Sequence, residues 1–135
     1  MTDNDAYRFP VSVKGVVIRE GRVILLKNHR NEWELPGGKL ELHETPESCV
    51  TREIAEELQL HVEAQRVLDS WVYTVAPGVH VLILTYGCTE PRGGTSAAVS
   101  AEHERFEWFP VGDVDSLDMP AGYKGSIRRW ASEAR

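Results

Sequence analysis

The segment from Thr45 to Leu58 constrains the fold of this chain more than any other, because it predicts one sharply bounded helix. Thr45 is suited to the N-cap position. Pro46 is suited to the first helical position, because its φ angle is already helical and its missing N–H costs nothing there. Val50, Ile54 and Leu58 recur every four residues and form an apolar stripe that needs another layer to cover it. We therefore expect a central helix packed against a sheet.

The same helix carries three glutamates, Glu53, Glu56 and Glu57, of which Glu53 and Glu57 lie at the edge of this apolar stripe. Their spacing of three and four residues places the carboxylates on one side of the helix, where like charges repel one another. Partly buried carboxylates also cost free energy unless a cation or a hydrogen-bond donor compensates them. Clustered carboxylate oxygens are the ligands that Mg²⁺ and Mn²⁺ prefer. The pattern predicts a divalent-cation site, and the alternative is a solvated acidic helix face.

The rest of the chain alternates apolar, β-branched stretches with turn signals. A short helical turn is expected at Val114–Leu117, and a final helix at Tyr123–Ala134. The stretches expected to be extended are Val11–Ile18, Arg22–Lys27, Trp33–Leu35, Val62–Val75, Val79–Cys88 and Arg105–Val111. No linker or repeat interrupts this order, so we expect a single α/β domain over residues 1–135, built on a mixed β-sheet.

Composition narrows the class of protein further. The chain has 135 residues, of which 41% are hydrophobic, and no apolar run approaches the length of a transmembrane span. The net charge of −6 argues against a partner that is a nucleic-acid polymer. Cys49 and Cys88 are expected to be reduced and buried. The N-terminal residues do not resemble a signal peptide, and we expect a cytoplasmic location without membrane association.

Residues 38–60 closely resemble the signature of the Nudix hydrolases, the family that includes MutT-like proteins. The match is specific because polar and glycine positions agree at fixed spacing. The matching residues are Gly38, Glu44, Arg52, Glu53, Ile54, Glu56, Glu57 and Leu60. Two glycines of the usual pattern are replaced, by His43 and by Gln59. We expect the Gln59 replacement to affect how the helix ends, and the His43 replacement to stiffen the loop and to place an imidazole near the substrate.

The resemblance implies a Nudix-type α/β/α sandwich that hydrolyses the diphosphate linkage of a nucleoside diphosphate joined to another group, X. Glu53, Glu56 and Glu57 would bind Mg²⁺, with Mn²⁺ as a substitute, and a water activated by the metal would attack phosphorus. The proton of that water would pass to Glu53, to Glu57 or to the loop residue Glu102, and the sequence does not choose among them. The small-molecule partner is thus a nucleotide diphosphate.

Four further residues complete the predicted site. Arg52 and Glu44 would orient the metal-binding carboxylates from outside, although an ordinary surface ion pair is the alternative. Gly37 and Gly38 would let backbone atoms approach the metal and the phosphates, or would simply form a turn. Glu41 is a loop carboxylate that either has a structural role or lies outside the ligands of the metal, and the sequence does not choose between these roles.

Other readings stay open at this stage. A nucleotide-sensing domain with the same fold and no turnover is the main alternative, and a diphosphate isomerase on this fold is a third. Pro77 is a weak indication of ADP-ribose as the substrate. His29, His61 and His80 are interpreted as surface or strand histidines. Four aromatic residues are interpreted as core, with stacking on a nucleobase as the alternative: Trp33, Tyr73, Phe106 and Trp108. The substrate and the oligomeric state are not predicted.

Overall fold

A computed structural model describes residues 5–98 and 105–133 of the chain. The expected alternation of strands and helices is confirmed, with small shifts at the element ends. The elements in chain order are β1 (Val11–Arg19), β2 (Arg22–Lys27), β3 (Trp33–Glu34), β4 (Gly37–Lys39), α1 (Pro46–Leu58), β5 (Glu63–Ala76), β6 (Val79–Thr89), β7 (Arg105–Pro110), the 3₁₀ helix η1 (Val111–Ser116) and α2 (Ala121–Glu133).

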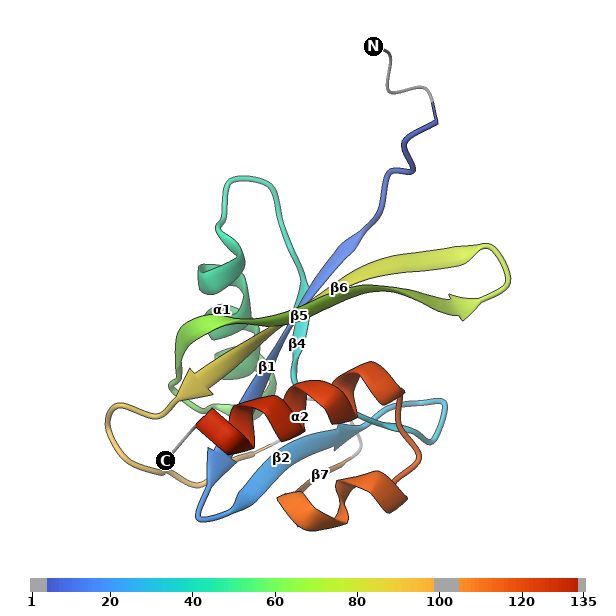
Figure 1. Cartoon of the computed structure of the whole chain (residues 1–135). Coiled ribbons are helices and arrows are strands. Elements are labelled where there is room, and N and C mark those ends of the chain that lie inside the picture. The colour runs from blue at the N-terminus through green and yellow to red at the C-terminus, as the bar shows by residue number, and fades with distance from the viewer. Residues whose placement is uncertain (1–4, 99–104, 134–135) are drawn as a thin grey trace.

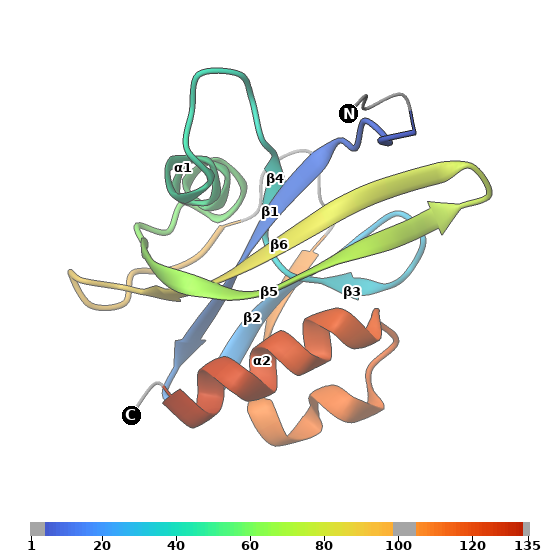
Figure 2. The same cartoon turned by 45° about the horizontal axis from the view of Figure 1, so that its top comes forward.

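The strands form one mixed sheet. Its main order is β3-β2-β1-β6-β5, while β4 pairs with β1 and β7 pairs with β2. Only the pairing of β1 with β6 is parallel among the strand pairs described. Helix α1 lies on one side of the sheet and α2 on the other (Figures 1 and 2). The predicted α/β/α sandwich on a mixed sheet is therefore confirmed.

Helix α1 begins and ends where the sequence indicates. The Thr45 hydroxyl accepts a hydrogen bond from the Ser48 amide at 3.1 Å, and the Ser48 hydroxyl accepts one from the Thr45 amide. This reciprocal cap satisfies two backbone donors at the helix start. Val50, Ile54 and Leu58 are fully buried, as expected from their spacing. They belong to one of the two apolar clusters, which fills the space between α1 and the sheet.

The second apolar cluster lies between the sheet and α2. It contains Ile127 and Trp130 of α2 together with Val16, Leu25 and Ile83 of the sheet. Cys49 and Cys88 belong to the α1 side, where both are buried and free, as predicted. Neither helix in the described residues has the length and hydropathy needed to cross a membrane.

Three details of the chain path differ from expectation. Gly37 and Gly38 lie in strand β4, which pairs with β1, and do not form a turn. The turn between β5 and β6 contains only Pro77 and Gly78, because Ala76 still pairs with Val79. The short helix after β7 begins at Val111, earlier than the sequence indicated.

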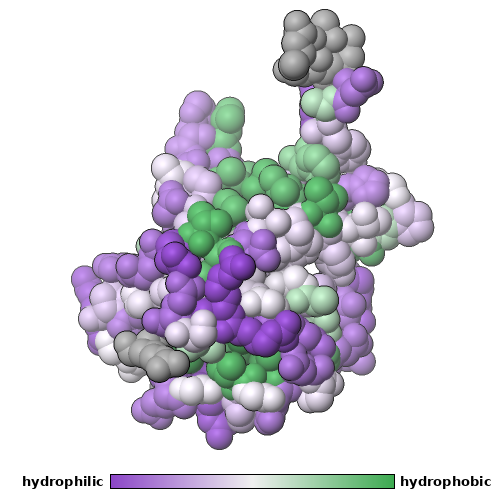
Figure 3. All heavy atoms as spheres, in the orientation of Figure 1, coloured by the Kyte–Doolittle hydropathy of each residue, from purple (hydrophilic) through white to green (hydrophobic). Residues whose placement is uncertain are grey.

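Strand β5 is an edge of the sheet, and on it Val67 and Val72 are about half exposed. Figure 3 shows apolar side chains gathered on the upper half of one face, above a mostly polar band.

Gln59 ends α1 in a conformation that glycine favours. Its φ angle is 58° and its ψ angle is 31°, and its amide donates to the Ala55 carbonyl at 2.9 Å. The helix therefore ends in the left-handed conformation expected for a glycine, although the residue there is a glutamine. His43 is likewise left-handed, at φ 72°. For a residue with a Cβ this conformation is strained.

We predict that Gln59→Gly stabilises the protein by about 0.5–1 kcal/mol, because relief of the left-handed strain exceeds the added flexibility of the unfolded chain. The Gln59 side chain is exposed, so its removal costs little packing. Urea unfolding measures the difference. Gln59→Ala is the matched control, since it removes the same side chain but keeps the Cβ. Equal stability of the two variants would contradict the strain argument.

Candidate functional site

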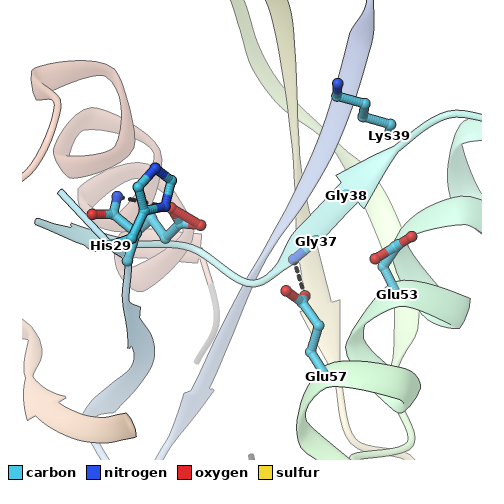
Figure 4. Close-up of a pocket in the computed structure, with 8 residues that line it drawn as sticks. His29, Gly37, Gly38, Lys39, Glu53 and Glu57 are labelled. Atoms are coloured by element: carbon cyan, nitrogen blue, oxygen red, sulfur yellow. Dashed lines mark hydrogen bonds between the residues drawn. The ribbon is translucent and has the colours of Figure 1, made fainter. Parts of the chain in front are cut away.

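One pocket brings together the glycine-rich strand β4, helix α1 and the loop that follows β2. It has a volume of about 540 Å³. Figure 4 shows Glu53 and Glu57 of α1 facing Gly37 and Gly38 of β4, with His29 across the pocket. The residues that line it are Asn28, His29, Glu34, Gly37, Gly38, Lys39, Glu53 and Glu57.

Glu57 is held at the buried end of this pocket. Glu57 is only 5% exposed, and its Oε1 accepts a hydrogen bond from the Gly37 amide at 2.7 Å. Gly37 has φ 145°, and a Cβ placed on it would lie 2.0 Å from the Val13 carbonyl oxygen. Only glycine can therefore occupy this position, where the backbone amide fixes the Glu57 carboxylate.

Glu53 lies against the next glycine. A Cβ on Gly38 would lie 2.3 Å from the Glu53 carboxyl carbon and from its Oε2. The missing side chain therefore lets the β4 backbone approach the carboxylate closely. The resulting site places two carboxylates next to strand backbone, inside a pocket open to solvent.

Arg52 joins the carboxylates that flank the pocket. Its guanidinium forms a bidentate pair with Glu44, through Nε at 3.1 Å and Nη2 at 2.9 Å. The remaining nitrogen, Nη1, donates to Glu53 at 2.9 Å and to Glu56 at 3.3 Å. Glu41, the acid left open by the sequence, lies farther away, 3.6 Å from Nη2 and mostly exposed. The planar fork of arginine suits such a junction, which a lysine could not reproduce.

The Arg52 pair has a clear electrostatic effect on Glu44. Hydrogen bonds from Arg52 and from the Glu41 amide lower the pKa of Glu44 from 4.5 to about 2. In return, the hydrogen bond to Glu44 raises the pKa of Arg52 further. Glu44 is therefore ionised at any physiological pH, and the pair stays charged on both sides.

The three carboxylates of the predicted metal site are not gathered at one point. Among the residues that the structure describes, no group of three His, Cys, Asp or Glu side chains converges as a metal would require. Glu53 and Glu57 line the pocket, whereas Glu56 does not line it and its side chain is 59% exposed. The donor set itself fits a hard cation, because it consists of carboxylate oxygens beside a glycine backbone. Glu102 lies outside the described residues.

Four pocket residues were not assigned to the site by sequence reasoning: Asn28, His29, Glu34 and Lys39. Asn28 Nδ2 donates to Glu34 Oε1 at 2.9 Å, and Lys14 lies 3.5 Å from Glu34 Oε2. The available signal was positional: Asn28 follows β2 directly, and Glu34 precedes the two glycines by only a few residues.

The remaining sequence interpretations are largely confirmed. His80 is paired through Nδ1 with the Thr74 hydroxyl at 2.8 Å, and His61 is exposed. His29 is also exposed, as expected, but it lines the pocket. His43 is exposed and is not among the residues lining the pocket, so the expected imidazole near the substrate is not seen. Trp33 is buried in the core against Phe109, with ring centroids 4.7 Å apart. The other three aromatic residues are only partly buried and pack against the core: Tyr73, Phe106 and Trp108.

Comparisons with known proteins identify the family of this chain. Residues 8–130 match the NUDIX domain family, and the chain therefore belongs to the Nudix family. It is 39% identical over 106 residues to a MutT-like protein of Streptomyces ambofaciens, covering 77% of this chain and 66% of that protein. It is 32% identical over 103 residues to a putative ADP-ribose pyrophosphatase of Bacillus subtilis, covering 73% of this chain and 49% of that protein.

A solved structure supports the same placement. The MutT Nudix hydrolase of Burkholderia pseudomallei superposes with a TM-score of 0.70 at 26% identity, covering 90% of this chain and 98% of that one. The chain spans less than two thirds of the length of both relatives named above. Nudix hydrolases generally use a divalent metal such as Mg²⁺.

We predict that Arg52→Met raises the pKa of Glu44 from about 2 toward 4.5, because the strongest donor to its carboxylate is lost. The wild-type pair stabilises the fold above the unfolded pKa of Glu44, and this stabilisation disappears as the pH falls through about 2. Carboxyl NMR titration of Glu44 measures both values. Arg128→Met is the control, since Arg128 pairs with Asp115 instead. An unchanged Glu44 titration in Arg52→Met would refute the assignment.

Proposed function

We propose that this protein hydrolyses the diphosphate linkage of a nucleoside diphosphate joined to a further group X, with Mg²⁺ as its cofactor. The observation that carries the proposal is the pair of carboxylates, Glu53 and Glu57, set in one pocket against the backbone of Gly37 and Gly38. Membership of the Nudix family supports the reaction class.

The metal ligands in this proposal are Glu53, Glu56 and Glu57, with Mn²⁺ able to replace Mg²⁺. When bound, the cation would neutralise phosphate charge and lower the pKa of a water molecule. Glu53 and Glu57 already line the pocket. Glu56 lies one residue before Glu57 on the exposed side of the helix. The fit therefore rests on hard oxygen donors supplied by a single helix.

The other residues of the site position groups and accept a proton. The Gly37 amide fixes the orientation of the Glu57 carboxylate. Arg52, anchored to Glu44, holds Glu53 and Glu56 in place. The proton of the attacking water would pass to Glu53, to Glu57 or to Glu102. A carboxylate within hydrogen-bond reach of that water suffices for this step.

Lys39 adds positive charge at the pocket. It lies on β4 next to Gly38, and its side chain is exposed. In the proposed reaction its ammonium would pair with phosphate oxygens as a mobile point charge. This contact would help to offset the negative charge that the acidic pocket presents to an anionic substrate.

A sensing domain without turnover is the second candidate. The observation that favours it is that no three metal-ligating side chains converge in the part of the chain that the structure describes. Glu53 and Glu56 are instead paired with Arg52. We also propose, as parts of the main hypothesis, a single domain over residues 1–135, a cytoplasmic location and no nucleic-acid polymer as partner. The match to residues 8–130 supports the first of these.

The deciding experiment is a substrate panel: nucleoside triphosphates, ADP-ribose, nucleotide sugars and dinucleoside polyphosphates, each with and without Mg²⁺. We expect Mg²⁺-dependent cleavage of at least one class. Glu57→Gln should reduce that turnover at least about 100-fold, because several kcal/mol of charge stabilisation are lost. The amide oxygen introduced by this substitution can still accept from Gly37, so the fold should survive. No cleavage by the wild type, with nucleotide binding retained, would favour the sensing domain.

A second prediction tests the close approach of β4 to the helix. Gly38→Ala should reduce turnover by on the order of 100-fold, because its Cβ displaces the Glu53 carboxylate from its position. Circular dichroism should show an intact fold. Gly112→Ala is the matched control, since a Cβ there meets no atom within 4 Å. Equal turnover in the two variants would show that Glu53 does not need its observed position.

A further inference from the structure

Two cations lie directly opposite each other at the ends of strands β2 and β7. Lys27, the last residue of β2, pairs with Arg105, the first residue of β7. On its other side Lys27 pairs with Trp33, the first residue of β3. Residues that pair directly across antiparallel strands project to the same face of the sheet, with Cβ atoms about 4.5–5.5 Å apart. The register of the sheet therefore holds Lys27 and Arg105, the cation pair, in one row with an indole ring.

The ring of Trp33 fixes the direction of both cations. Lys27 Nζ lies 4.6 Å from the ring centroid, and Arg105 Cζ lies 5.0 Å from it. At these distances each cation is attracted to the face of the ring. Trp33 is itself anchored by its contact with Phe109 in the core. Arg105 is exposed and Lys27 is partly exposed, so the cation pair is accessible from solvent in a defined arrangement.

No carboxylate of the described residues compensates the cation pair, since neither Lys27 nor Arg105 forms an ion pair there. The next acid along β7, Glu107, lies opposite Leu25 instead. Like charges placed directly opposite each other destabilise a sheet, so an anion from outside the chain would stabilise this arrangement. Other arginines are compensated within the chain, each by a carboxylate: Arg19, Arg30, Arg52, Arg66 and Arg128.

The loop that follows Lys27 connects the cation pair to the pocket. Asn28 comes directly after Lys27 and lines the pocket, as does His29. Figure 4 shows His29 on the opposite side of the pocket from Glu53 and Glu57. Consecutive Cα atoms are only about 3.8 Å apart, which brings Lys27 to the edge of this wall. A ligand that extends from the two carboxylates past His29 therefore meets the cation pair.

This loop is held in one conformation by the Asn28 side chain. Its Oδ1 accepts hydrogen bonds from the amides of Arg30 at 2.9 Å and Glu32 at 3.0 Å. Its Nδ2 donates to Glu34 Oε1 at 2.9 Å. The Asn28 amide also donates to the Glu32 carbonyl at 2.9 Å. The distance between the pocket and the cation pair is therefore fixed by the fold.

Phosphate is the anion that suits the cation pair. A guanidinium binds phosphate oxygens in a bidentate manner, and an ammonium supplies a compact point charge beside it. A sugar hydroxyl is neutral, so it would leave the repulsion between the two cations in place. The chemistry of the cation pair therefore favours a phosphate over a sugar at this end of the substrate.

We propose that the cation pair binds a phosphate group of X, and that Lys27 and Arg105 are specificity-determining residues for the hydrolysis. This inference rests on the proposed function and names its substrate class: nucleoside triphosphates and longer polyphosphates, rather than ADP-ribose or nucleotide sugars. In this arrangement Glu53 and Glu57 lie beside the linkage to be cleaved, and the cation pair holds the phosphate beyond it.

The first test measures binding without turnover. Calorimetry in metal-free buffer compares the affinity for inorganic tripolyphosphate of the wild type, Lys27→Gln and Arg105→Gln. We expect each substitution to weaken binding about tenfold, which is the effect of one hydrogen bond to a charged group. Circular dichroism should show the same fold in all three proteins. Unchanged affinity in either variant, or no binding to the wild type, overturns the proposal.

Two further variants separate a site from the attraction of net charge. Arg22→Gln is the matched control, because Arg22 is exposed at the opposite end of the same strand pair, across from Pro110. It removes the same unit of charge, and we expect it to leave the affinity for tripolyphosphate unchanged. Lys27→Arg keeps the charge and should retain most of the affinity. Equal losses in Arg22→Gln and Lys27→Gln would mean that net charge alone attracts the anion, which overturns the site.

Hydrolysis separates this inference from the proposed function. With Mg²⁺, kcat/KM is compared for ATP against ADP-ribose, and for UTP against UDP-glucose. The members of each pair share the nucleoside diphosphate and differ only in X, which is a phosphate or a sugar. We expect the wild type to favour the triphosphates about tenfold, mainly through KM, and Lys27→Gln to lose this preference.

The two proposals fail in different ways. Cleavage at equal kcat/KM within each pair overturns the preference for phosphate and leaves the hydrolase intact. Tripolyphosphate binding that depends on Lys27 and Arg105, without cleavage of any nucleotide, supports the cation pair and overturns the hydrolase.

Discussion

The close packing of strand β4 against helix α1 is the constraint on which the site depends. Gly37 donates its amide to Glu57, and it can do so only because no Cβ separates the strand from the Val13 carbonyl. Gly38 likewise leaves space for the Glu53 carboxylate. β4 is in turn fixed by its pairing with β1, at the centre of the sheet. The positions of two acidic side chains are thereby tied to the register of the sheet.

Arg52 has a different part in the same site. Four acidic residues lie around its guanidinium, and three of them accept hydrogen bonds from it: Glu44, Glu53 and Glu56. Without a cation at this place, carboxylates at helical spacing would repel one another. The Arg52 guanidinium therefore offsets the repulsion between Glu53 and Glu56. Its bidentate pair with Glu44 holds the guanidinium in a fixed position between them. The negative charge of the site is thus stabilised by a cationic side chain at its edge.

Much of the fold could be predicted because it depends on local patterns. The helix follows from Thr45, Pro46 and the buried stripe that ends at Leu58, and β-branched runs located the long strands. The positions of Glu53 and Glu57 at the margin of that stripe also followed from helical periodicity. These features require no knowledge of which strands are neighbours.

The missed residues depend on pairing between distant segments. Lys14 is one polar position in an apolar strand, and its meeting with Glu34 results from the sheet order. Asn28 reaches the pocket because β2 and β3 pair beside it. Sequence predicted that Arg52 orients these carboxylates, but it did not reveal that one nitrogen, Nη1, would bond to both Glu53 and Glu56, since side-chain ion pairing is decided by competing contacts. Glycine at the helix exit was replaceable because glutamine adopts the same backbone conformation.

The parallel pairing of β1 with β6 has a consequence for how this molecule folds. Val11 pairs with Leu82 and Val17 with Cys88, so the central strand finds its neighbour only after more than half of the chain has been made. Such distant contacts require the closure of a long loop, and they slow folding relative to local hairpins. The β1–β2 hairpin can form early on the ribosome, but the strand that carries Lys14 stays open on one edge until β6 arrives. Nascent chains are thus exposed to mispairing at that edge for much of their synthesis.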